Sequence, residues 1–309
     1  MTQTFIHVEH LTEVELSTPT YLAIGSFDGV HVGHQAVLQE MVAAARADGR
    51  RSAVLTFFPH PTRVLRGQEG PYYITTLADR VRLLAEQGID LIITHPFNEE
   101  VRLTRAADFV DQLIRYLDMR QIWGGNFAFG YKREGDVPFL RRLGAERGFS
   151  VELVRSMVEV QGDWVSSSRI RRCLTEGNVA TVRECLGRPF HVTGDVAQGD
   201  QRGRTIGFPT ANLAAWDELL LPANGVYATY AWLGDQRYVA ATNVGVRPTV
   251  NGRGVTVEAH LLDYSGDLYG QELRVEFIQH IRPEKKFSGL PELTAQIQAD
   301  VSAIRAMLA

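Results

Sequence analysis

The spacing of apolar runs changes near residue 187, and this change constrains the fold more than any other feature of the chain. Between residues 20 and 155, short β-type runs alternate with segments of helical periodicity. Such alternation predicts a parallel sheet covered by helices on both faces, with a ligand beyond the carboxyl ends of the strands. The predicted strands are Tyr21–Ile24, Ser52–Phe58, Ile89–Thr94, Gln121–Trp123 and Val151–Val154, with helices at 35–47, 76–87, 104–116 and 136–147, of which the second should be capped by Thr76 and the fourth by Asp136.

From Phe190 onward, closely spaced strands are separated by turns such as Asn224–Gly225 and Gly234–Asp235. This spacing predicts an antiparallel barrel or sandwich. Residues 291–308 carry an apolar stripe at helical spacing, so a C-terminal helix should pack against this β-domain. Short helices around 170–174 and 179–186 connect the two parts. We therefore predict an α/β domain at 1–186 and a β-domain at 187–309.

Composition limits the classes of partner. The chain has 309 residues and a net charge of −4, which argues against a nucleic-acid binder with a broad basic surface. Its two cysteines, Cys173 and Cys185, fit no zinc-binding spacing and should be reduced and structural. We see no signal-peptide core, and no apolar run approaches the roughly 20 residues needed to span a bilayer. The expectation is a cytoplasmic protein without membrane or nucleic-acid partners; a homo-oligomer is left open.

Residues Gly25–His34 form a glycine-rich turn between a predicted strand and a predicted helix. The N–H groups and the dipole of a helix N-terminus suit phosphate. His31 and His34 are three residues apart, so they share a helix face and can stabilise charge that develops at phosphorus. A plain tight turn is the next interpretation. A metal site is the weakest, because no cysteine or carboxylate cluster lies nearby.

Two further segments of the first domain carry polar groups that could bind a ligand. The serines of Val165–Arg171 stand where a loop enters a helix, and Arg169 offers a planar guanidinium to a phosphate oxygen. Taken alone, this segment is more typical of a serine cap with solvated arginines. Asn126 lies at a strand end and is a candidate ligand contact, whereas Phe57 and Phe127 are more typical of a core.

The second domain contains its own dense motif. Glycines recur every four residues in Gly199–Asn212, which permits close approach of the backbone to an anion. Thr210 and Asn212 supply neutral oxygens that could complete a Mg²⁺ shell beside ATP phosphates. A glycine-kinked hairpin is an equally good local interpretation. Glu258 shares a strand face with Thr256 and His260, because side chains alternate along a strand. Such a carboxylate usually just faces solvent.

The first-domain motifs resemble those of bacterial bifunctional riboflavin kinase/FAD synthetases. Gly25–His34 is similar to their variant of the HxGH motif, and Val165–Arg171 to (I/V)SSTxIR, with Ser168 in place of Thr. Segments 57–61 and 125–130 resemble TFxPHP and G-[DN]-F-x-F-G, although Phe58 and Ala128 depart from the residues common there. The resemblance implies a Rossmann-like nucleotidylyltransferase domain. It makes His31, His34 and Arg169 catalytic, and assigns ATP phosphates to Gly25, Phe27, Asp28, Gly29, Gly33, Asn126, Ser166, Ser167 and Ser168.

The second domain resembles riboflavin kinases through GxxxGxxxGxPTAN, and the likeness as a whole spans about residues 20 to 305. It implies a β-barrel kinase domain with a C-terminal helix. Glu258 would be the general base for the ribityl 5′-hydroxyl, and Thr210 and Asn212 would hold Mg²⁺. ATP would contact Gly199, Gly203, Gly207 and Pro209, and flavin would contact Asn243, Arg282 and Phe287.

The implied activity is two-step synthesis of a flavin cofactor. Riboflavin and ATP would give FMN, and FMN and a second ATP would give FAD and pyrophosphate, with flavins as substrates and products. One alternative is a kinase whose first domain has decayed, since Phe58 and Ala128 depart from the family pattern; the retained histidines and serine–arginine segment argue against it. Another alternative is a flavin or nucleotide sensor without turnover.

Overall fold

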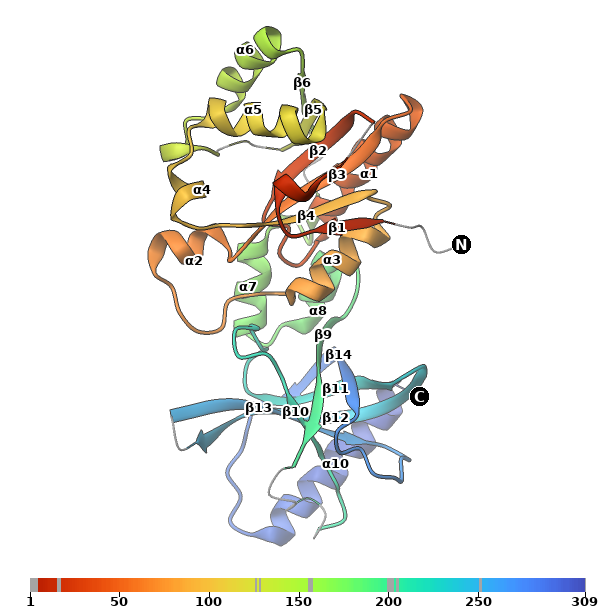
Figure 1. The fold of residues 1–309 in the computed structure, drawn as a ribbon. Helices are drawn as coiled ribbons and strands as arrows, with labels where there is room; N and C mark the ends of the chain where they lie inside the picture. The colour runs from red at the N-terminus through yellow and green to blue at the C-terminus, as the bar shows by residue number, and fades with distance from the viewer. Residues whose placement is uncertain are drawn as a thin grey trace. The chain divides into compact units, whose positions relative to one another are not determined.

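The computed structural model describes residues 5–15, 18–125, 127, 129–154, 158–198, 203, 206–249 and 252–308. The chain forms two compact units. The first comprises residues up to 69 together with 75–165, and the second comprises 70–74 together with 166–309. Each unit has a fold of its own (Figure 1).

The first unit is built on a six-stranded parallel sheet in the order β1-β4-β3-β2-β5-β6. The five predicted strands are confirmed. The additional edge strand β1 pairs Ile6 with Leu91; at three residues, it was too short to show a periodic pattern. The strands are β1 (Ile6–Val8), β2 (Thr20–Gly25), β3 (Arg51–Phe58), β4 (Leu91–Pro96), β5 (Met119–Gly124) and β6 (Ser150–Leu153).

Helices cover both faces of this sheet. Successive residues of one strand, such as Leu22 and Ala23 of β2, enter different apolar cores. One core contains side chains from α1 and α3, and the other contains side chains from α5 and α6. The predicted caps Thr76 and Asp136 are confirmed at the starts of α3 and α6. The helices are α1 (Val32–Ala47), α2 (Pro61–Arg66), α3 (Leu77–Glu86), α4 (Glu99–Leu103), α5 (Ala106–Leu117) and α6 (Val137–Arg147); the hairpin β7 (Glu159–Val160) and β8 (Asp163–Trp164) follows.

The second unit contains a closed antiparallel barrel, which decides between the barrel and the sandwich. Its strand order is β10-β13-β12-β11-β14-β9. The predicted C-terminal helix is α10 (Leu290–Leu308); it contacts β12 and β11 and buries Val301 and Ile304. The strands are β9 (Phe190–Ala197), β10 (Ala211–Ala214), β11 (Gly225–Leu233), β12 (Gln236–Thr249), β13 (Gly252–Leu261) and β14 (Glu272–Arg282).

Two segments that precede the predicted boundary pack within the barrel unit. Helices α7 (Ser167–Thr175) and α8 (Val179–Leu186) pack against each other, and α8 contacts β9 and β14. Tyr73, which is fully buried, stacks on Trp216 with ring centroids 4.9 Å apart. The boundary between the compact units thus lies near residue 165, and the predicted domain limits at 186 and 187 stay a prediction.

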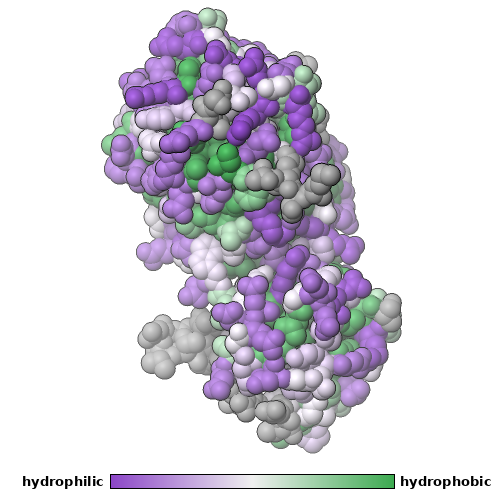
Figure 2. Space-filling view, turned by 45° about the vertical axis from the view of Figure 1, so that its right-hand side comes forward, coloured by the Kyte–Doolittle hydropathy of each residue, from purple (hydrophilic) through white to green (hydrophobic). Residues whose placement is uncertain are grey.

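No helix among the described residues is long and apolar enough to cross a membrane. Hydrophilic residues cover most of the face seen in Figure 2, and apolar residues gather in smaller areas between them.

Candidate active sites

The glycine-rich turn between β2 and α1 brings its two histidines together. His31 caps α1, and its Nδ1 accepts a hydrogen bond from the backbone N–H of His34 at 3.2 Å. Because Nδ1 is the acceptor, the imidazole carries its proton on Nε2. The cap thereby fixes the tautomer that can donate a hydrogen bond to an anion.

His34 is held against His31. Their rings stack with centroids 3.6 Å apart, and the Phe27 ring meets His34 edge-on. Burial, the neighbouring His31 and the charge of Arg80 lower the pKa of His34 well below its ordinary value. Its buried Nδ1 has no hydrogen-bond partner among the described residues. Without a bound anion, His34 is therefore a neutral donor rather than a cation.

The backbone of this turn approaches the histidine rings closely. Phe27, Gly29 and Val30 have φ values of 45°, 86° and 38°, all in the left-handed region. A Cβ on Gly33 would lie 3.2 Å from the His31 ring and 4.0 Å from the Val165 carbonyl oxygen. Glycine at this position leaves room for the ring that caps the helix.

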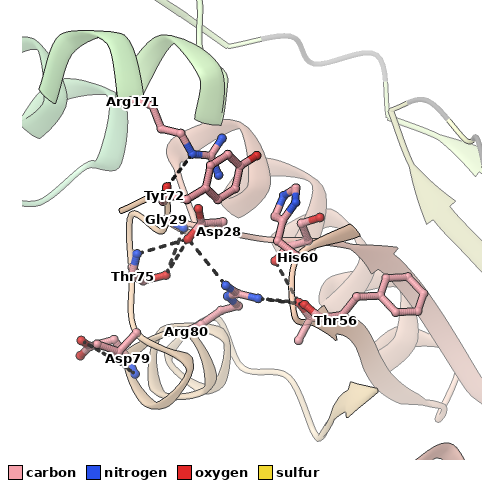
Figure 3. A network of polar contacts seen from close by, with 12 residues as sticks. Asp28, Gly29, Thr56, His60, Tyr72, Thr75, Asp79, Arg80 and Arg171 are labelled. Atoms are coloured by element: carbon pink, nitrogen blue, oxygen red, sulfur yellow. Dashed lines mark hydrogen bonds and ion pairs between the residues drawn. The ribbon is translucent and has the colours of Figure 1, made fainter. Parts of the chain in front are cut away.

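Asp28 differs from the other predicted phosphate contacts. Its side chain is fully buried and faces Thr75 and Arg80 (Figure 3). The carboxylate therefore belongs to the support of the turn, and a phosphate contact by Asp28 would have to use its backbone.

The serine run begins α7. Ser166 is the N-cap, and its hydroxyl accepts a hydrogen bond from the Arg169 N–H at 3.2 Å. Ser168 is exposed, Ser167 is half-buried and Arg169 is buried. The capping interpretation is thus confirmed for Ser166, whereas the expectation of solvated arginines is wrong for Arg169. The predicted phosphate contacts of this segment remain predictions, and Asn126 lies outside the described residues.

An aromatic cavity of about 340 Å³ lies in the first unit. Its volume falls in the range of small-molecule sites. Phe57 lines it, and both Phe57 and Phe127 belong to the core as predicted. Sequence reasoning missed most of the lining because it comes from α2, α4, α5 and two loops; Phe97, Phe109, Phe129 and Tyr131 are its other aromatic residues.

The barrel brings together three predicted site residues from three strands. Asn212 of β10 pairs with Glu258 of β13, which pairs with Asn243 of β12. Directly paired residues share a face of the sheet. Neighbouring residues such as Val257 and Ala259 are buried inside the barrel, so this row lies on its outer face, as the predicted alternation around Glu258 required.

A cavity of about 580 Å³ adjoins this row. Strands of the barrel, residues 284–287 and the apolar side of α10 enclose it. Its size and mixed lining suit a ligand with an apolar ring system and polar groups. Six predicted residues line it, namely Gly203, Thr210, Asn243, Glu258, Arg282 and Phe287.

The surroundings of the two predicted metal ligands, Thr210 and Asn212, suit a cation. The Oδ1 atom of Asn212 is buried without a hydrogen-bond partner among the described residues, so it can accept a cation. The half-buried Thr210 lines the adjoining cavity. The described residues contain no group of three or more His, Cys, Asp and Glu that could hold a metal ion. Neutral oxygens of this kind fit Mg²⁺ that is bound mainly by nucleotide phosphates.

The glycine motif around Thr210 is only partly described. A Cβ on Gly203 would come within 2.3 Å of the Phe208 carbonyl oxygen, so this position requires glycine. Gly207 has a φ of 85° and is exposed, as is Pro209. The Pro209 carbonyl lies 2.8 Å from a ring nitrogen of His260. Gly199 lies outside the described residues.

Arg282 holds α10 against the barrel. Its guanidinium forms a bidentate ion pair with Asp300, which is 5% exposed, with N···O distances of 2.7 to 3.1 Å. The same guanidinium lies 5.8 Å from the Phe287 ring. Its flavin contact stays a prediction; Arg282 shapes the cavity by holding the helix that closes it.

Comparisons with known proteins agree with the presence of two different candidate sites, one in each part of the chain. A family model described as FAD synthetase matches residues 13–169, and one described as Riboflavin kinase matches 186–308. A bifunctional riboflavin kinase/FMN adenylyltransferase from Escherichia coli (strain K12) is 38% identical over 282 residues, covering 90% of each chain. One from Listeria monocytogenes is 33% identical over 308 residues, covering 99% of this chain and 98% of the relative.

A solved structure described as a macrolide-efflux protein from Streptococcus pneumoniae has a TM-score of 0.88 at 30% identity, covering 97% of this chain and 98% of that one. The fold is therefore shared over nearly the whole length. Both family models and the relatives of matching length indicate the same family. The chain belongs to the family of bifunctional riboflavin kinases/FMN adenylyltransferases.

Proposed function

We propose that the chain makes FAD from riboflavin in two ATP-dependent steps, with the kinase in residues 187–309 and the adenylyltransferase in residues 1–186. The observation that carries the proposal is the row Asn212–Glu258–Asn243 beside a cavity of flavin-compatible size. The second support is the stacked histidine pair at the start of α1. Location in the cytoplasm and self-association stay predictions.

In the kinase step, the ribityl 5′-hydroxyl of riboflavin attacks the γ-phosphorus of ATP. Glu258 accepts the hydroxyl proton, the bond from the γ-phosphorus to the bridging oxygen breaks, and ADP leaves. Asn243 and Phe287 orient the flavin, while backbone groups of Gly203 and Gly207 approach the ATP phosphates. Mg²⁺ held by Thr210 and Asn212 would neutralise charge on those phosphates. The chain's own contribution is mainly alignment.

In the second step, a phosphate oxygen of FMN attacks the α-phosphorus of ATP, and pyrophosphate leaves. His31 and His34 donate hydrogen bonds to oxygens on which charge grows, and the charge of the complex favours protonation of His34. Ser167, Ser168 and Arg169 bind the leaving pyrophosphate. The aromatic cavity beside Phe57 holds the isoalloxazine ring of FMN by stacking and burial.

Turnover of riboflavin separates this proposal from its alternatives. The chain is incubated with riboflavin, ATP and Mg²⁺, and the flavins are separated by chromatography. The proposal expects FAD. Accumulation of FMN alone would favour a kinase with a decayed first domain, and unchanged riboflavin would favour a sensor. Supplying FMN directly in a second reaction tests adenylyl transfer independently of the kinase.

A further inference from the structure

The turn after β2 is strained and must be held from outside. Phe27 and Val30 are non-glycine residues with positive φ, at 45° and 38°. Each such residue costs on the order of 1–3 kcal/mol and persists only where its surroundings over-determine it. The helix cap at His31 fixes the end of the turn. A different set of contacts fixes its middle.

Thr75 and Arg80 supply those contacts (Figure 3). The backbone N–H and the hydroxyl of Thr75 both lie 3.2 Å from Asp28 Oδ1, and the N–H of Gly29 donates to the same hydroxyl. An Nη2 atom of Arg80 lies 3.6 Å from Asp28 Oδ1. The middle of the turn is thus attached to residues about fifty positions further along the chain.

Arg80 links this attachment to the end of a neighbouring strand. Its Nη1 donates to Thr56 Oγ1 at 3.4 Å and to the Phe57 carbonyl at 3.3 Å. Thr56 in turn donates to the carbonyl oxygen of Ser26, the residue before the strained turn, at 2.9 Å. One guanidinium therefore holds the ends of β2 and β3 and the Asp28 carboxylate in one arrangement.

Burial makes this pair decisive for the turn. The side chains of Asp28 and Arg80 are both 0% exposed. A buried charge that loses its partner is strongly destabilising, so the carboxylate must move or take up a proton when Arg80 is removed. Asp28 stands between the two strained residues, and His31 follows three positions later. Any movement of the carboxylate is therefore transmitted to the histidines.

We propose that Arg80 is a positioning residue for adenylyl transfer, which acts by holding the phosphate-binding turn through Asp28. The sequence pattern does not indicate this role, because Arg80 is one of several charged residues on an amphipathic helix. The inference rests on the proposed function of the first domain. It adds a residue that never touches the substrate but sets the geometry of two that do.

Arg80→Met is the principal test, made in the full chain. We expect kcat for FMN-to-FAD conversion to fall on the order of 10²-fold, the loss typical of a misplaced catalytic group. Riboflavin phosphorylation by the same preparation should remain within two-fold, as roughly expected for a distant independent site. The matched control is Arg82→Met on the same helix. Its side chain is 43% exposed and pairs with Asp79 and Glu86 at the surface, so both activities should be unchanged.

A double-mutant cycle tests whether Arg80 acts through Asp28. If it does, Asp28→Asn combined with Arg80→Met should cost no more than the worse single change. Losses that multiply would overturn the proposal, as would a normal kcat in Arg80→Met. NMR titration gives an independent readout: the pKa of His34 should rise in Arg80→Met, because a nearby positive charge is lost.

A second variant guards against misfolding. If Arg80→Met also loses kinase activity, Arg80→Lys decides the matter, since it keeps a cation opposite Asp28 but loses the planar fork. We expect an intermediate loss of adenylyl transfer with normal kinase activity. Unchanged FAD synthesis in Arg80→Lys would contradict the proposal. Absence of FAD in the unmodified chain would instead contradict the proposed function, so the two failures are distinguishable.

Discussion

The two units of this protein build their proposed phosphate sites in opposite ways. In the first unit, ten consecutive residues from Gly25 to His34 provide a strand end, a turn and a capped helix start. In the second, Asn212, Glu258 and Asn243 come from three strands and meet only because those strands pair in register. A local site depends on backbone conformation, whereas an assembled site depends on the register of the whole barrel.

The supporting contacts differ in the same way. The local site carries its strain in the backbone and is held by a buried ion pair, Asp28–Arg80. The barrel site has regular strands and is closed by α10, which Arg282 fastens through Asp300. Changes at one of these two sites should therefore leave the other activity intact, and the following predictions test that independence.

Asn212→Ala should have the largest effect. It removes the buried oxygen that is proposed to order Mg²⁺, so alignment and charge neutralisation are lost together. We expect riboflavin phosphorylation to fall on the order of 10³-fold or more. FMN-to-FAD conversion should be unchanged. The exposed Asn224 is a suitable control for an Asn→Ala change in the same unit. FMN formation within a few-fold of the parent would refute the assignment of Asn212.

His34→Ala should produce the reverse pattern. Removing one donor to a developing charge typically costs on the order of 10²–10³ in rate. We expect that loss in FAD formation from FMN, with normal riboflavin phosphorylation, measured by chromatography of the flavins. His260→Ala in the barrel is the comparison variant, because this histidine is not part of the proposed adenylyltransferase site and FAD formation from FMN should stay normal. A normal FAD yield in His34→Ala would show that the histidine is structural.

Two fragments measure how far the barrel unit extends. Residues 187–309 contain the barrel and α10, and 166–309 add α7 and α8. Val182 and Leu186 of α8 are 0% and 1% exposed, and burying each contributes about 1.5–3 kcal/mol. The longer fragment should therefore be more stable by about 3 kcal/mol in denaturant unfolding, and both should phosphorylate riboflavin. Equal stabilities would show that α8 adds nothing to the barrel.

The smallest effect concerns pH. His34 has a lowered pKa in the folded chain, so below about pH 6.5 the unfolded chain binds more protons than the folded one. Stability should therefore fall as pH falls, by at most about 1.4 kcal/mol per pH unit from this group. His34→Gln should show a shallower slope in chemical denaturation. Identical slopes would mean that burial of His34 has no energetic consequence.

Much of the fold could be predicted because its signals are local. Alternating runs predicted five of the six parallel strands, and Thr76 and Asp136 marked two helix starts. The misses were short elements: β1 has three residues, α2 six and α4 five. Such segments are stabilised by what they pack against rather than by their own periodicity. The choice between barrel and sandwich likewise depended on pairing that no single strand specifies.

The sequence by itself determined the turn that we propose binds phosphate, because a strand, a glycine-containing turn and a helix start are contiguous and dictate where their N–H groups point. Only the tertiary structure decided what holds that turn, since Asp28 and Arg80 are far apart in the chain. It also decided that Asn212 and Glu258 face the same cavity-bearing side of the barrel. A register shift of one residue would turn a strand's side chains to the opposite face, and register is set by the packed barrel as a whole.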